Sequence, residues 1–455
     1  SMLMECLSAG RAISLPSSAN GGAQVAALAS GAYARVRKQF NQSIGKFEGI
    51  EEPLARIAAN TYIIDAGVMM AAAAIDQGAK PSVAGAILKY HTTERARLVA
   101  IDAMDIHGGK GICLGPNNYL ARGYEALPIA ITVEGANILT RSLIIFGQGA
   151  IRCHPYVFQE LESVRTQDVK AFDKAFTGHV AFFMGNLTKS LIFAWTDGLL
   201  SKAPESPAKR YYQLIHKYSA NLAFLADFSM VVLGGDLKRK EKLSARLGDM
   251  LSSLYLASAV LKRFQEDGEP EADFPVVAWS CQQLLHECET AMQGVIINFP
   301  TAWTRVVLHV ILKPLGHRRH KPNDQLGHKL AQILIEPNDT RSRITRLVYS
   351  KPSQNCPLGR LEEAFHKLSA VADVEKKVIS AVKAGTLKSL TLLDQIAEAL
   401  HNKLITATEA KQLHEAELAR QEVIKVDDFS DQELRRSTAS SKVGSGKVAK
   451  VKTEL

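Results

Sequence analysis

The chain has 455 residues, 46% of them hydrophobic but only 7% aromatic, and with alanine and leucine abundant it favours helices over sheets in two to four domains. Its formal net charge is +9, but the basic excess gathers toward residues 436–455 and is not interleaved with stacking aromatic side chains, which argues against nucleic-acid binding. The six cysteines show no paired spacing, so free thiols in a reducing, cytoplasmic compartment are expected rather than a disulfide framework.

Four helical segments open the chain. Residues 3–39 form the first predicted helix, a long segment rich in alanine and leucine. Two more are predicted over 49–77 and 81–106, with Pro81 suited to the first turn of a helix. A fourth over 129–150 completes an antiparallel four-helix bundle.

The fourth segment carries an unusual carboxylate. Glu134 is the only acidic residue in an apolar and small-residue run over 126–151, and Gly135 follows it directly. An apolar environment disfavours the charged form of a carboxylate and so makes it a stronger base, while glycine lets another molecule approach the backbone. The alternative is that Glu134 only complements the dipole at a helix N-terminus.

Residues 156–455 are predicted to be mostly helical, and no metal-ligand spacing appears in them. No run reaches 18 uncharged apolar residues. The most apolar candidate, 180–200, is interrupted by Asn186, Lys189 and Asp197, and it is predicted to be a buried helix.

A shorter helix has a mixed character. Arg305, His309 and Lys313 recur every four residues in an apolar stretch that begins near Trp303. A basic stripe on an apolar helix is typical of a helix at a membrane surface. The same pattern fits an amphipathic helix docked on its own domain, so both interpretations stay open.

Four elements, taken together, resemble the C-terminal α-domain of acyl-CoA dehydrogenases. They occur in the family's order and at its spacing over residues 3–150: the step Gly10-Arg11, the element Arg37-Lys38-Gln39-Phe40, the loop Gly108-Gly109-Lys110-Gly111 and the pair Glu134-Gly135. From about Cys153 onward the chain resembles the extra C-terminal domain of the large bacterial long-chain members. The family's N-terminal helical domain and middle β-domain have no counterpart here, so we expect a C-terminal portion of such a protein.

The resemblance implies an all-α fold with a defined organisation. Residues 1–152 would form the antiparallel four-helix bundle, and 153–430 a second, mostly helical domain. The last segment, 431–455, would be a basic disordered tail, since from Ser437 it is rich in serine, lysine and glycine and lacks apolar content.

The resemblance also implies an activity. The parent enzyme would be an FAD-dependent dehydrogenase that converts (long-chain) acyl-CoA to trans-2-enoyl-CoA in fatty-acid β-oxidation. Glu134 would remove the α-proton, with Arg11 and Gly135 beside it. Some family members carry the base just before this arginine, but Gly10 occupies that position here, which leaves Glu134 as the candidate.

Cofactor contacts follow from the same resemblance. It assigns six residues to contacts with FAD: Arg37, Phe40, Asp105, Gly108, Gly109 and Ala136. The residues at the end of the first helix and in the glycine loop would reach the FAD of a neighbouring subunit. The planar guanidinium of Arg37 suits a pyrophosphate, because it binds two oxygens at once. Asp105 and Ala136 stand where the family often has glutamine and threonine, so they offer fewer donors. A helix C-cap explains Gly108 and Gly109 equally well.

The implied partners are acyl-CoA, electron-transfer flavoprotein as electron acceptor, and further copies of the chain, in the cytoplasm or at the inner membrane surface. A second hypothesis remains open. Because the β-domain normally supplies much of the flavin pocket, the chain by itself would be a non-catalytic helical assembly or membrane-docking module. Flavin absorbance of the purified protein distinguishes the two.

Overall fold

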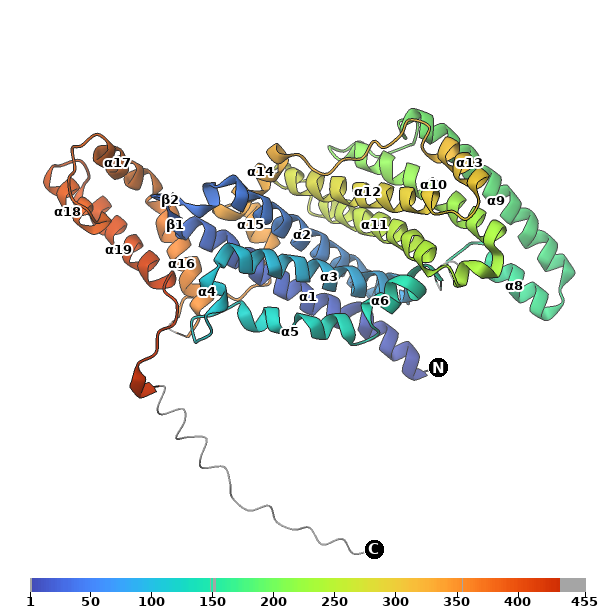
Figure 1. Ribbon diagram of the computed structural model, residues 1–455, viewed down its shortest axis with the longest axis horizontal. Helices are drawn as coiled ribbons and strands as arrows, with labels where there is room; N and C mark the ends of the chain where they lie inside the picture. Colours follow the sequence, from blue (N-terminus) through green and yellow to red (C-terminus); the bar gives the residue numbers. More distant parts are fainter. Residues whose placement is uncertain (1, 148, 150–152, 354, 434–455) are drawn as a thin grey trace, which may run out of the picture.

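The computed structural model describes residues 2–147, 149, 153–353 and 355–433, and these are almost entirely helical (Figure 1). Two short antiparallel strands, β1 (Lys38–Gln39) and β2 (Gln42–Ser43), form a hairpin after the first helix. The prediction of an all-α fold is confirmed. Most of the predicted basic tail, from residue 434 on, lies outside the described residues.

The first three helices form the predicted bundle. They are α1 (Met2–Val36), α2 (Glu48–Asp76) and α3 (Ser82–His107), close to the ranges that the sequence predicts. Ala12 lies against Gly85, and the rings of Tyr33 and His107 stack at 4.3 Å, so α1 and α3 run parallel and α2 runs antiparallel to both. Small residues allow this close approach, because a Cβ on Gly85 would lie 3.0 Å from that of Ala12.

The fourth predicted helix, over 129–150, is wrong as a single element. Helix α5 (Ala121–Thr132) ends, and α6 (Asn137–Leu139) begins a second piece that continues as the π-helical segment η2 (Thr140–Ile145), with a bend of 47° between the two pieces. At the break, Glu134 and Gly135 have φ angles of 54° and 94°. Two successive left-handed residues cannot continue a right-handed helix, although the apolar pattern runs through them.

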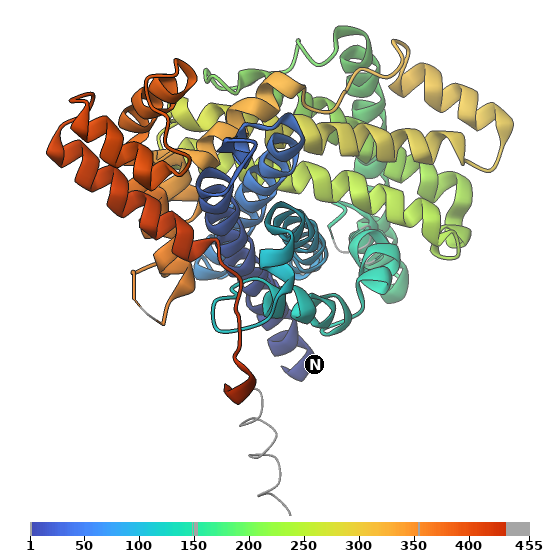
Figure 2. The same cartoon turned by 60° about the vertical axis from the view of Figure 1, so that its left-hand side comes forward.

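The later helices flank this bundle on two sides (Figure 2). Helices α8 to α13 lie on one side, and α16 to α19 form an arm on the other. In chain order the remaining elements are η1 (Ile44–Lys46), α4 (Gly109–Ile112), α8 (Val157–Thr166), α9 (Val169–Thr196), α10 (Lys209–Leu233), η3 (Gly234–Lys238), α11 (Glu241–Glu266), η4 (Glu271–Asp273), α12 (Phe274–Ile297), α13 (Ala302–Leu312), α14 (Asp324–Ile335), α15 (Asp339–Ile344), α16 (Pro357–Ala370), α17 (Ala372–Lys383), α18 (Leu392–His401) and α19 (Ala407–Val423).

One continuous core joins the two halves of the chain. Helices α11 and α14 pack on α2, and α14 and α16 pack on α1. The packing on α1 is tight, because a Cβ on Gly31 would collide with the carbonyl group of Leu334. The helices beyond residue 153 therefore complete the core that α1 and α2 begin.

A buried carboxylate sits inside this shared core. Asp65 of α2 is 1% exposed and accepts hydrogen bonds from Asn20 Nδ2 (2.7 Å) and Gln24 Nε2 (3.3 Å) of α1. Its partners from the second half are Arg263, at 2.7 Å, and Arg346, at 3.0 Å. Asp65 thus connects α1, α2, α11 and the segment after α15.

Two helices are long and apolar enough to cross a membrane by length and composition: α2 and the stretch Lys209–Lys238, or three spans if the bent pair of α5 and α6 counts as one. In the structure α2 is the central helix of the bundle, and most of its apolar stretch is buried.

The prediction that 180–200 forms a buried helix is wrong. Helix α9 leaves Phe176, Val180 and Trp195 exposed, because burial depends on a partner surface that composition does not reveal.

The environment of His107 predicts a loss of stability in acid. Burial lowers its pKa to about 4, although a hydrogen bond to the Ala103 carbonyl at 2.7 Å opposes this. The unfolded chain, in which the pKa of histidine is about 6.5, binds more protons, so the free energy of unfolding falls as pH drops from about 6.5 toward 4, by about 3 kcal/mol for this residue. His91, whose pKa burial lowers to about 3, acts in the same direction.

We therefore expect His107→Phe to flatten the pH dependence of stability in this range while keeping a ring against Tyr33. Urea unfolding at pH 6.5 and 4.5 measures the difference, with His216→Gln, an exposed histidine of α10, as control. An unchanged slope in His107→Phe would contradict the prediction.

Candidate active site

Glu134 and Gly135 occupy the break between α5 and α6, at one end of the bundle. A non-glycine residue with positive φ is uncommon and indicates a conformation imposed by its surroundings. The Glu134 side chain is exposed, and its Oε1 accepts a hydrogen bond from Ser14 Oγ at 3.2 Å. The expected apolar enclosure of Glu134 is not formed by the described residues of this chain, so that expectation is wrong here.

A buried lysine holds this turn from behind. Lys89 of α3 is 0% exposed, and its Nζ donates to the Gly135 carbonyl oxygen at 2.7 Å and to Asn137 Oδ1 at 2.6 Å. Burial lowers the pKa of Lys89 below its ordinary value. Asn137 in turn donates to Thr93 Oγ1 (3.0 Å) and Glu94 Oε1 (2.9 Å), so the turn is tied to two successive turns of α3.

The role of Lys89 is not visible in the sequence. Within the segment 81–106 it is one polar residue of a helical pattern, and nothing local indicates that it is buried. Its partners lie 46 and 48 residues further along the chain. Only the antiparallel approach of the broken fourth helix brings them together.

Arg11 of α1 supports the same turn. Its Nη2 donates to Thr140 Oγ1 at 2.7 Å, and a Cβ on Gly135 would lie 3.3 Å from the same nitrogen. Burial lowers the pKa of Arg11, while the charge of Glu134 acts in the opposite direction. The structure therefore brings Arg11, Glu134 and Gly135 together.

Most of the predicted cofactor residues lie elsewhere. Ala136 is exposed beside Glu134, as the residue that precedes α6. The other five lie at the far ends of α1 and α3: Arg37, Phe40, Asp105, Gly108 and Gly109. From Arg11 to Arg37 the chain rises along α1 by about 39 Å, at about 1.5 Å per residue. One chain therefore does not bring these five residues to its own Glu134.

The far end presents an open surface. Phe40 is 90% exposed at the tip of the β1–β2 hairpin, with φ of 49°. Arg37 is half-buried and forms no ion pair with any residue that the structure describes. Asp105 is exposed on the last turns of α3.

Gly108 and Gly109 close this end of α3. Gly108 has φ of 52°, and its N–H donates to the Met104 carbonyl oxygen at 2.9 Å, so the helix-cap interpretation holds. A Cβ on either glycine would meet nothing within 4 Å, so the backbone also remains open to another molecule. The next residue, Lys110, is buried and donates to the Lys425 carbonyl oxygen at 2.6 Å, which brings the chain after α19 against this loop.

Two family models match the chain. Residues 1–146 match the family described as acyl-CoA dehydrogenase, C-terminal domain, and residues 151–429 match acyl-CoA dehydrogenase, C-terminal, bacterial type. The chain belongs to the acyl-CoA dehydrogenase family. The resemblance that the sequence elements indicate is thus confirmed at the level of the family.

Two relatives illustrate the extent of similarity within this family. The chain is similar to 3-(aryl)acrylate reductase of Clostridium sporogenes, with 38% identity over 141 residues that cover 31% of this chain and 37% of that protein. It is also similar to the mitochondrial very long-chain specific acyl-CoA dehydrogenase of Bos taurus, with 27% identity over 247 residues, covering 53% and 36%. The chain therefore spans little more than a third of the length of these relatives.

Solved structures of acyl-CoA dehydrogenases and oxidases share the fold. An acyl-CoA dehydrogenase complexed with FAD from Bacillus anthracis superposes with a TM-score of 0.56 at 20% identity, over 73% of this chain and 56% of that one. Acyl-CoA oxidase 1 of Arabidopsis thaliana gives 0.51 at 12% identity, over 78% and 51%. At these identities the likeness shows the architecture alone.

Proposed function

We propose that this chain is the C-terminal portion of an FAD-dependent acyl-CoA dehydrogenase that acts on long-chain acyl-CoA in fatty-acid β-oxidation. Membership of the family supports flavin-dependent acyl-CoA dehydrogenation in general. The observation that carries the finer proposal is the exposed Glu134 carboxylate on a left-handed turn fixed by Lys89 and Arg11. A carboxylate held in one place and open to a ligand is suited to act as a general base.

In this proposal Glu134 takes the α-proton of the thioester while a double bond forms between the α- and β-carbons. FAD, when bound, supplies the acceptor for the hydride that leaves the β-carbon. A positioned base contributes about 10²–10⁴-fold to the rate, so donors to the thioester oxygen and exclusion of water are also required. Since Glu134 is exposed in this chain, other parts of the enzyme must cover it.

The residues at the far end fit a phosphate-bearing cofactor. Arg37 lacks a carboxylate partner among the described residues, and the backbone at Gly108 and Gly109 is open. Phe40 offers an almost fully exposed ring at the tip of the hairpin that follows α1. Because this end lies far from Glu134, we infer that the FAD lies between two copies of the chain, one giving the base and the other the phosphate contacts.

Flavin retention tests the proposal. The protein containing this chain together with the remaining family domains is expected to keep flavin absorbance through gel filtration and to reduce an electron acceptor, electron-transfer flavoprotein, in the presence of long-chain acyl-CoA. Arg37→Ala is expected to lose flavin while staying folded. A colourless, inactive protein in that complete form would refute the proposal.

Lys89→Met is expected to lower kcat about 10- to 100-fold with little change in KM. Methionine fills the buried channel but leaves the Gly135 carbonyl without its donor, and a displacement of about 1 Å at a reacting group costs about 10² in rate. Steady-state kinetics and thermal unfolding measure the two effects, with the exposed Lys80→Met as control. Wild-type kcat in folded Lys89→Met would show that the turn holds without the lysine.

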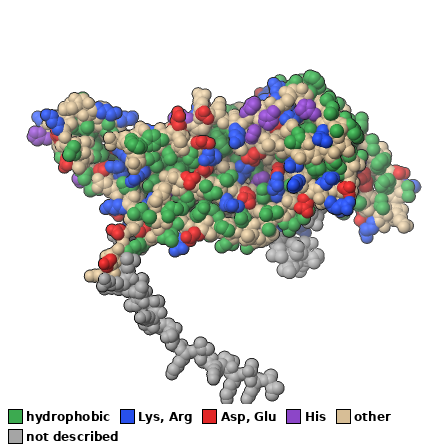
Figure 3. Space-filling view, viewed as in Figure 1, with side chains coloured by type: hydrophobic (Ala, Val, Ile, Leu, Met, Phe, Trp, Pro, Cys, Tyr) green, Lys and Arg blue, Asp and Glu red, His purple; other side chains and the backbone are tan. Residues whose placement is uncertain are grey.

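A second candidate function, docking on a membrane, rests on an apolar surface. Figure 3 shows hydrophobic side chains gathered at the end of the molecule that α9, α10 and α13 form. The large exposed side chains of α9 and α13 include Phe176, Val180, Met184, Leu191, Ile192, Trp195, Trp303, Val306 and Val310, and the two helices contact each other. Isolated exposed apolar residues are ordinary, whereas a contiguous surface of this kind typically marks an interaction site.

Helix α13 has features of both interpretations of its sequence, a helix docked on its own domain and a helix at a membrane surface. It docks on its own domain through Thr304, Leu308 and Leu312, which are buried, and turns its other faces outward. The predicted basic stripe is wrong at Lys313, which is buried and donates to Gln293 Oε1 at 2.8 Å. Arg305 remains exposed beside the apolar surface.

We expect the double variant Trp303→Asp/Val306→Asp to bind vesicles containing anionic lipid at least about tenfold more weakly than wild type, because it removes two large apolar side chains from the surface. Vesicle co-sedimentation at two salt concentrations measures this. Leu390→Asp, at a leucine that is 96% exposed in the arm of α16 to α19, is the matched control. Equal binding by all three proteins, or none by wild type, would contradict membrane docking by this surface.

A further inference from the structure

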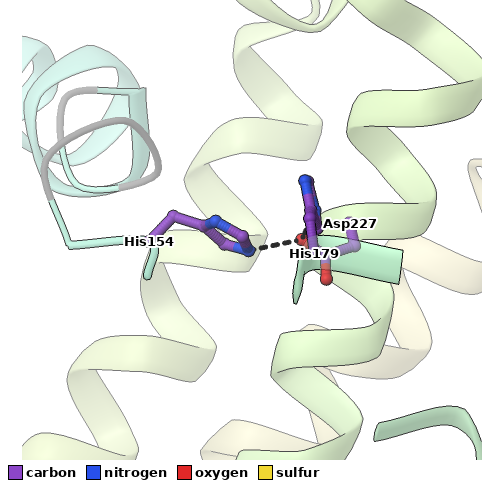
Figure 4. Close-up of side chains that lie close together, drawn as sticks. All are labelled: His154, His179 and Asp227. Carbon is purple, nitrogen blue, oxygen red and sulfur yellow. Dashed lines mark ion pairs between the residues drawn. The ribbon is translucent and has the colours of Figure 1, made fainter. Parts of the chain in front are cut away.

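Three polar side chains from separate segments converge beside α10 (Figure 4). His154 precedes α8, His179 lies on α9 and Asp227 lies on α10. His154 Nε2 is 3.0 Å and His179 Nε2 is 3.6 Å from Asp227 Oδ1, and one ligand atom of each residue lies within 4.8 Å of the other two. The sequence shows no metal-ligand spacing here, because these residues are far apart in the chain.

The group lacks partners for buried polar atoms. Asp227 is 1% exposed, yet neither of its carboxylate oxygens has a well-aligned hydrogen bond to any described residue. The same holds for His154 Nε2, which is near Oδ1 in distance but misaligned. A buried carboxylate without a hydrogen bond is costly, so the site favours a bound cation.

The tautomer of His179 points to a metal ion. Its Nδ1 lies 2.8 Å from Glu160 Oε1, and since a carboxylate only accepts, Nδ1 carries the hydrogen. In the neutral ring, Nε2 therefore presents a lone pair to Asp227, another acceptor. A histidine that donates one N–H to a carboxylate while its other nitrogen faces outward is the usual arrangement of a metal ligand.

His154 is oriented by the start of α8. Its Nδ1 accepts the backbone N–H groups of Tyr156 (3.2 Å) and Val157 (3.1 Å), which turns Nε2 toward Asp227. In this tautomer the ring hydrogen is on Nε2, so binding of a metal ion at Nε2 moves that hydrogen to Nδ1 and releases the two backbone N–H groups. The rings of Tyr156 and Phe182 lie 6.3 and 5.4 Å from that of His154.

We propose that His154, His179 and Asp227 bind one divalent cation of the zinc class, with a fourth position open. Zinc bonds of about 2.0–2.1 Å in a tetrahedron separate ligand atoms by about 3.3 Å, and the two distances to Asp227 lie on either side of that value. Two imidazoles and one carboxylate suit zinc, whereas calcium and magnesium prefer oxygen ligands alone. The ion fastens the start of α8, α9 and α10 to one another, independently of the proposed dehydrogenase activity.

Zinc content of the full chain tests the proposal. After treatment with EDTA and dialysis against ZnCl2, wild type is expected to retain one zinc per chain through gel filtration, and CoCl2 in its place is expected to give the visible absorption of a tetrahedral cobalt site. Asp227→Asn and His179→Gln are expected to lose both signals. His216→Gln, an exposed histidine on the same helix as Asp227, keeps them.

A variant outside the three ligands tests the site even if the ligand variants unfold. Glu160→Gln leaves all three ligands in place but weakens the acceptor of His179 Nδ1–H, so zinc affinity is expected to fall about 10- to 100-fold in a folded protein. Absence of bound zinc in folded wild type would overturn the proposal. So would one zinc per chain of unchanged affinity in Asp227→Asn or in Glu160→Gln.

Discussion

Replacing Glu134 by glutamine is expected to remove turnover while leaving acyl-CoA and flavin binding nearly intact. Glutamine has the shape of glutamate and keeps an oxygen that accepts the hydrogen bond from Ser14 Oγ, but it cannot take a proton from the substrate. Loss of a general base costs at least about 10² in rate. The expected kcat is therefore no more than about one-hundredth of the wild-type value.

The measurement is kcat with long-chain acyl-CoA in the enzyme that contains this chain and its remaining family domains, together with flavin absorbance and a substrate titration. Glu125→Gln provides a matched control, because Glu125 is an exposed carboxylate of α5 that pairs only with Arg122 among the described residues. Retention of a tenth of wild-type kcat by Glu134→Gln would exclude Glu134 as the base.

Asp65→Ala is expected to lower the free energy of unfolding by about 3–5 kcal/mol, the typical cost of removing one partner of a buried ion pair. The substitution leaves the buried Arg263 with only the longer pair to Asp267, at 3.4 Å, among the described carboxylates, and it also removes the acceptor of Asn20 Nδ2. Urea unfolding followed by circular dichroism measures the loss.

The exposed Asp76→Ala, on the same helix, is expected to change stability by no more than about 0.5 kcal/mol. The pair Asp65→Leu/Arg263→Met is expected to recover most of the stability, since apolar replacement of both partners of a buried pair is often neutral. A loss below about 1 kcal/mol in Asp65→Ala would show that water or other side chains compensate the arginine.

The helices of the bundle were predictable because each carries a long pattern with clear ends. The predicted segments 49–77 and 81–106 correspond to α2 (Glu48–Asp76) and α3 (Ser82–His107). The break in the fourth helix was not predicted, since apolar residues continue on both sides of Gly135 and a glycine within a helical pattern does not by itself fix a left-handed turn. The left-handed turn there is bonded to Lys89, a contact between distant residues.

The candidate site was predictable only in part for the same reason. A lone carboxylate in an apolar run is a local signal, and it made Glu134 a candidate, whose role as the base stays a prediction. Lys89 and the convergence of His154, His179 and Asp227 depend on contacts between helices, which no spacing along the chain encodes. The apolar face of α9 was predicted to be buried but is exposed, because its composition resembles that of a core helix.

The shared core has a consequence for synthesis of the chain. A ribosome releases residues in order, so α1 and α2 leave the exit tunnel well before α11, α14 and Arg346, which cover them. Until that point, the apolar faces that α11 and α14 cover are exposed, and Asp65 lacks its arginine partners Arg263 and Arg346. At about 5–20 residues per second, this interval lasts on the order of ten seconds or more. Nascent chains that end between these elements are thus the forms in which the protein is most exposed to aggregation.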